Sequence, residues 1–136
     1  MSGSFELAAI LVRRMMANFI DMNKAKFLVV GVGKYIDGEY QYETDVLDFI
    51  VELKKYNKPV HVFDNDADIE FLKEHYDIDC RNKMVNFGLV STYSGIVFGV
   101  TENKYSYPNF ILEEHIRGNS VILNFATPSE LYLTHG

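Results

Sequence analysis

The chain has 136 residues, which suits one domain, since most domains contain roughly 100–150 residues. Hydrophobic residues make up 48% of it, with 10 Phe and 9 Tyr, so it can form a core and is not an intrinsically disordered protein. The net charge of −6 argues against a general nucleic-acid-binding protein, because affinity for phosphate backbones comes mainly from Lys and Arg.

Cys80 is the single cysteine, so the sequence offers no internal disulfide and no cysteine pair at metal-site spacing. This favours a reducing, intracellular setting. The N-terminus lacks an apolar segment with a small-residue cleavage site, and no apolar run approaches the roughly 20 residues that span a bilayer. We therefore expect a cytoplasmic protein without a membrane partner.

The first predicted element is a helix over residues 5–20, capped by Ser4. Seven of its hydrophobic residues fall close to helical spacing: Phe5, Ala8, Ala9, Val12, Met15, Met16 and Phe19. Because few helices are hydrophobic on nearly all sides without being buried, we expect a core helix packed on a sheet. The alternative is a contact with a second copy of the chain, which would make the protein a homo-oligomer.

The segment 26–66 has the pattern of a strand, a helix and a second strand parallel to the first. The first strand, Phe27–Val30, is continuously hydrophobic, as expected for a strand buried on both faces. Thr44 can cap the helix, and Val60–Phe63 forms the second strand after Pro59. Such a βαβ unit is the basis of nucleotide-binding α/β folds.

Gly31 and Gly33 follow the first strand, where missing side chains would let backbone N–H groups approach an adenosine or phosphate group. They can equally serve only a tight turn. The next segment, residues 34–43, is longer than a standard βα connection of about 2–6 residues and is rich in tyrosine around Asp37-Gly38. It is either a lid over a bound base or an ordinary surface insertion.

Asp64 ends the second strand, a position from which a carboxylate can accept hydrogen bonds from both hydroxyls of a ribose. The alternative role is capping, since Asp64, Asn65 or Asp66 could satisfy the first amides of a helix over residues 67–76. Three candidates at one turn leave one free for a ligand.

The rest of the chain is predicted as a polar connection over residues 77–82, strands at 84–87, 95–100 and 121–125, and a helix that begins at Pro108 and ends at Gly118. The tail, residues 129–136, has no assigned structure. Glu102 and Asn103 follow a strand and would border a pocket at the same sheet edge as Gly31 and Asp64, where sheet ligands gather.

This order of elements, with Gly31-Val32-Gly33 and Asp64, resembles the front part of class I S-adenosylmethionine-dependent methyltransferases over roughly residues 5–128. Residues 109–125 are similar to the late helix, glycine turn and strand of such domains. The resemblance implies one three-layer, Rossmann-like α/β domain over residues 1–136, with a mostly parallel sheet of about five strands. It also implies binding of S-adenosylmethionine or a related adenine nucleoside and, in an enzyme, methyl transfer. The implied cofactor-binding residues are Gly31, Gly33, Asp64, Glu102 and Asn103.

The sequence also departs from that family. Val29 stands where an acidic residue is usual, Tyr35 replaces a third glycine, and the chain ends before the final antiparallel strands. No set of catalytic or metal-binding side chains has persuasive spacing, and no catalytic Tyr/Lys pair supports an NAD-dependent oxidoreductase. The alternative is a non-catalytic interaction or assembly protein with a ligand-free Rossmann-like fold, whose first helix covers a partner or a second copy.

Overall fold

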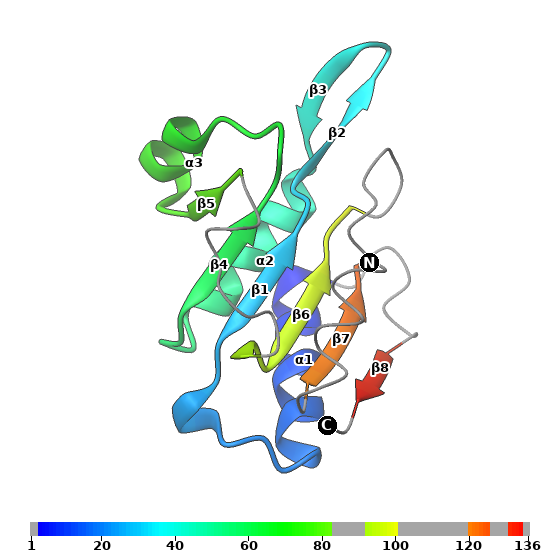
Figure 1. The fold of residues 1–136 in the computed structure, drawn as a ribbon, viewed down its shortest axis with the longest axis vertical. Coiled ribbons are helices and arrows are strands. Elements are labelled where there is room, and N and C mark those ends of the chain that lie inside the picture. Colours follow the sequence, from blue (N-terminus) through cyan, green and yellow to red (C-terminus); the bar gives the residue numbers. More distant parts are fainter. Residues whose placement is uncertain (1–2, 83–91, 101–119, 126–130, 135–136) are drawn as a thin grey trace.

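The computed structural model describes residues 3–82, 92–100, 120–125 and 131–134, and shows a sheet with helices packed on it (Figure 1). The helices are α1 (Ser4–Ala17), α2 (Thr44–Lys54) and α3 (Ile69–Tyr76), with a short 3-10 helix at Met22–Lys24. The strands are β1 (Phe27–Val30), β2 (Gly33–Ile36), β3 (Glu39–Tyr42), β4 (Val60–Phe63), β5 (Asp79–Arg81), β6 (Gly95–Phe98), β7 (Ser120–Asn124) and β8 (Leu131–Thr134).

The main sheet has the strand order β5-β4-β1-β6-β7-β8, in which the first five strands are parallel and β8 is antiparallel to β7. Strands β1 and β4 pair with Val30 opposite Phe63, which confirms the predicted βαβ unit. The order is Rossmann-like, because the chain adds β4 and β5 on one side of β1 and then returns to add β6, β7 and β8 on the other side of β1. The predicted α/β class with a mostly parallel sheet is confirmed.

Helices α1 and α2 pack on each other and lie behind the sheet in Figure 1. Side chains from all three helices join one core cluster with Phe27, Val29 and Val62 of the sheet. The opposite sheet side chains, Leu28 and Ile96 among them, form a second buried cluster. The helix and strand predicted at residues 108–118 and 84–87 lie outside the described residues.

Helix α1 confirms the prediction of a core helix, since Leu7, Leu11 and Met15 are buried. Its start differs from the prediction, because Gly3, not Ser4, is the N-cap residue. The helix also leaves three large hydrophobic side chains in water, although their spacing had placed them in the buried set. These are Phe5, Met16 and, just after the helix, Phe19, with exposed fractions of 68%, 58% and 93%.

The caps of α2 and α3 also lie elsewhere than predicted. Thr44 is the first residue of α2, and Glu43 is the N-cap residue. Helix α3 begins at Ile69, and Asp68 caps it by accepting a hydrogen bond of 3.1 Å from the Phe71 amide. Several carboxylates at one turn can all satisfy helix amides, so sequence alone did not select the one that does.

Two strands of the main sheet lie where the sequence predicted none. Strand β5 lies in the predicted polar connection, and it pairs with β4 although only Cys80 of its three residues is buried. Strand β8 occupies the unassigned tail and adds an antiparallel edge strand. The expectation that the chain stops short of antiparallel strands was therefore wrong.

The tyrosine-rich segment forms a hairpin of β2 and β3 that rises beyond the carboxyl edge of the sheet (Figure 1). Its turn is Asp37-Gly38, with φ angles of 52° and 83°. Positive φ at both central residues matches the right-handed twist of the strands, and Asp-Gly is a preferred pair for it. The hairpin aligns Tyr35, Tyr40 and Tyr42 on one face, since Tyr35 pairs with Tyr40 and Gly33 with Tyr42.

Candidate functional site

The carboxyl ends of β1, β4 and β6 meet where the strand order reverses, the place at which α/β sheets usually bind ligands. The Gly31 amide donates a hydrogen bond of 2.8 Å to the Phe63 carbonyl, so the tips of β1 and β4 lie side by side. The structure thus brings together Gly31, Gly33 and Asp64, as predicted. Glu102 and Asn103 lie outside the described residues.

Asp64 has no exposed surface, and its carboxylate accepts hydrogen bonds from Val32, Tyr40 and Asp66 among the described residues. The Val32 amide and the Tyr40 hydroxyl donate to Oδ2 at 2.9 and 2.8 Å, and the Asp66 amide donates to Oδ1 at 2.8 Å. A buried carboxylate is stable only when such donors replace water. Asp64 therefore fastens the end of β1 and the hairpin to the end of β4.

The two predicted glycines make room for protein atoms. A Cβ on Gly31 would lie 3.0 Å from the Val100 carbonyl oxygen, and one on Gly33 would lie 2.5 Å from the Tyr40 ring. A Cβ on Gly99, directly after β6, would likewise overlap the Gly31 carbonyl oxygen. Gly99 was not predicted as a site residue, because it lay inside the strand predicted at residues 95–100, whereas β6 ends at Phe98.

A chain of aromatic contacts joins the hairpin to α3. The rings pack in the order Tyr35, Tyr40, Tyr42, Phe71 and His75, with neighbouring centroids 4.4–5.5 Å apart. The Tyr42 hydroxyl also accepts a hydrogen bond of 3.0 Å from the amide of the α3 cap residue. Burial is the main cause that raises the pKa of Tyr42. The face of the hairpin that carries Tyr40 and Tyr42 thus packs against the rest of the protein, through Asp64 and α3.

The environment of Cys80 suppresses its reactivity. Burial, reinforced by the negative charge of Asp64, raises the pKa of Cys80 to about 12, so the thiol is protonated at neutral pH and is a poor nucleophile. Among the described residues, no three His, Cys, Asp or Glu side chains are grouped so that they could hold a metal ion.

His61 forms a polar cluster within β4. Its Nδ1 and the Tyr93 hydroxyl form a hydrogen bond of 2.6 Å, and its Nε2 lies 3.9 Å from Asp79 Oδ2. Burial lowers the pKa of His61, and the charges of Arg81 and Lys26 lower it further, whereas Asp79 opposes them. The neutral imidazole is therefore favoured in the folded protein.

This shift predicts that acid weakens the fold. An unfolded histidine has a pKa of about 6.5, so as the pH falls below that value the unfolded chain binds a proton before folded His61 does. The free energy of unfolding, measured by urea titration, should therefore be highest above about pH 6.5 and decrease towards pH 5. His61→Gln should flatten this decrease, whereas His75→Gln, on the exposed face of α3, should leave it in place. An equal slope in both variants would contradict the assignment to His61.

No helix within the described segments is long and apolar enough to cross a membrane. Comparisons of the chain with protein-family models, curated proteins and solved structures returned no match.

Proposed function

We propose that this chain is a non-catalytic interaction domain that retains a Rossmann-like sheet and uses the carboxyl edge of that sheet to hold a projecting hairpin. The observation that supports this is the state of Asp64, which is fully buried and hydrogen-bonded to Val32, Tyr40 and Asp66. A ribose could reach this carboxylate only by displacing donors that stabilise the fold.

The exposed hydrophobic side chains support the same proposal. Of the six large hydrophobic residues that the described segments expose, three lie on α1 or just after it and two on β2. They are Phe5, Met16 and Phe19, and Tyr35 and Ile36. Phe5 and Met16 share one side of α1, and exposed hydrophobic residues grouped on one surface are typical of sites that bind another protein.

The second candidate function is binding of S-adenosylmethionine or a related adenine nucleoside, with methyl transfer as the implied reaction. The strand order favours it, because ligands of such sheets bind beside the point where the order reverses. In this function Gly31 and Gly33 would supply backbone contacts, Asp64 a ribose contact, and Glu102 and Asn103 the pocket border.

A thermal-shift panel with S-adenosylmethionine, S-adenosylhomocysteine, NAD and ATP distinguishes the interaction function from nucleoside binding. A ligand at 100 times its Kd stabilises the folded state by about 2.7 kcal/mol, which raises the Tm by several degrees. We expect each compound at millimolar concentration to leave the Tm within about 1 °C of the Tm of the free protein, well below the shift that a bound ligand would cause. Sodium sulfate, which stabilises folded proteins generally, is the control for a responsive assay. Specific stabilisation by one compound would overturn the proposed function and select the second.

A further inference from the structure

Phe5 and Met16 lie on the same side of α1, because eleven residues correspond to about three turns of helix. Both side chains are more than half exposed, at 68% and 58%. Ala9 lies between them on this side, with a side chain small enough to let another helix approach closely. This Phe5–Met16 stripe borders the core side of the helix, since Val12, one turn before Met16, is buried.

The stripe has the symmetry of a self-complementary surface. Phe5 and Met16 are equally distant from the midpoint of the helix between Ile10 and Leu11, so an antiparallel copy of α1 places Met16 opposite Phe5 at both ends. We propose that α1 pairs with α1 of a second copy about a two-fold axis through this midpoint. The proposal rests on the proposed function, for which it names the partner.

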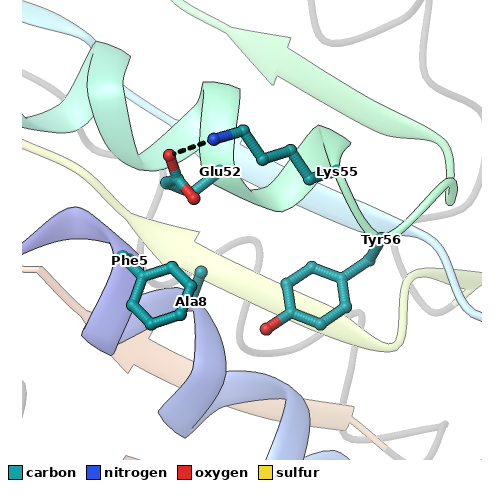
Figure 2. Close-up of a pocket in the computed structure, with 5 residues that line it drawn as sticks. All are labelled: Phe5, Ala8, Glu52, Lys55 and Tyr56. Atoms are coloured by element: carbon teal, nitrogen blue, oxygen red, sulfur yellow. Dashed lines mark hydrogen bonds and ion pairs between the residues drawn. The ribbon is translucent and has the colours of Figure 1, made fainter.

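A hollow beside Phe5 fits the side chain that this pairing would bring there. The hollow has a volume of about 100 Å³ and is lined by Phe5 and Ala8 of α1 and by Glu52, Lys55 and Tyr56 from α2 and the turn after it (Figure 2). Met16 of the second copy lies opposite Phe5 in the pairing, and its flexible thioether suits an irregular space.

Charges beside the stripe are complementary in the same arrangement. Glu6 and Arg13 are both exposed and lie next to the stripe on the side away from the core. In the antiparallel pair, Glu6 lies within two residues of the position opposite Arg13 of the second copy, which is within reach of the long arginine side chain. The two-fold axis creates this contact twice. A parallel pair would instead bring like charges together.

The expected dimer is weak. A helix of 14 residues is about 21 Å long, so the contact would bury an area at the low end of specific interfaces, below about 1,200 Å². Self-association should therefore depend on concentration in the micromolar range or above.

A charge-swap experiment tests the pairing by sedimentation equilibrium at low salt. Glu6→Arg and Arg13→Glu should each weaken self-association about tenfold, because each turns two attractive contacts into repulsive ones. An equimolar mixture of the two variants should associate at least as well as the unmodified protein, since a mixed dimer regains two opposite-charge contacts. Arg14→Glu, on another side of α1, is the matched control and should change association little.

Met16→Ala should also weaken association, because it removes the side chain that fills the hollow. Circular dichroism of every variant checks that it is folded. A protein that stays monomeric to about 1 mM, or a mixture no stronger than its components, would overturn the pairing. A failure of the pairing would leave the proposed function standing. Stabilisation by an adenine nucleoside in the thermal-shift panel would instead overturn the proposed function and leave the measured self-association unchanged.

Discussion

Replacing Asp64 with alanine should lower the free energy of unfolding by about 3–5 kcal/mol, the usual cost of removing one partner from a buried charged network. The substitution leaves the Val32 and Asp66 amides and the Tyr40 hydroxyl without their acceptor, and an unsatisfied buried donor costs about 1–3 kcal/mol. Urea unfolding followed by circular dichroism measures the loss.

Two variants with smaller expected losses serve as comparisons for Asp64→Ala. Tyr40→Phe removes one hydrogen bond to Asp64 and should cost about 1–2 kcal/mol. Asp68→Ala removes a carboxylate from the same turn, but an exposed one that only caps α3, and should cost about 1 kcal/mol. A loss at Asp64 no larger than that at Asp68 would contradict the structural role. Asp64→Ala is for the same reason a poor test of ribose binding, because an unfolded variant also loses ligand affinity.

Replacing Gly99 with alanine should destabilise the protein by about 2–3 kcal/mol through overpacking. The added methyl group would overlap the Gly31 carbonyl oxygen and lie 2.8 Å from Val46 Cγ1. Neither backbone segment can withdraw easily, because the Gly99 amide is hydrogen-bonded at 2.9 Å to the Val30 carbonyl. The midpoint of urea unfolding should fall accordingly.

Gly3→Ala is the matched control for this substitution, because a Cβ at Gly3 would meet no atom within 4 Å. Alanine is a poorer N-cap residue than glycine, so a loss below about 1 kcal/mol is expected there. Equal effects at Gly3 and Gly99 would mean that the carboxyl ends of β1 and β6 are less closely packed than the structure shows.

The parts of the fold that the sequence predicted well are those with a strong local pattern. The helix that buries Val46 and Leu53 has hydrophobic residues at helical spacing. The runs Phe27–Val30 and Val60–Phe63 are short and rich in β-branched and aromatic residues, which favours strands. Strand β5 has no such pattern, because its place depends on pairing with β4 rather than on its own residues.

The candidate site could be predicted only in part, for a physical reason. Local pattern placed Gly31 and Asp64 at one edge of the sheet, and the structure confirms that placement. What fills the space around them is decided by residues distant in the sequence, such as Tyr40 and Val100. A glycine that admits a ligand and a glycine that admits a neighbouring side chain look the same in a sequence.

The ring contacts from Tyr35 to His75 have a mechanical consequence. A two-stranded ribbon alone is marginally stable in water. This one is hydrogen-bonded to Asp64 by Val32 at its base and by Tyr40 of β3, and its Tyr42 ring stacks on Phe71 of α3. Its bending is thereby confined to the region around Asp37 and Gly38. A protein that grips this tip would immobilise few additional bonds, so it would lose little conformational entropy on binding.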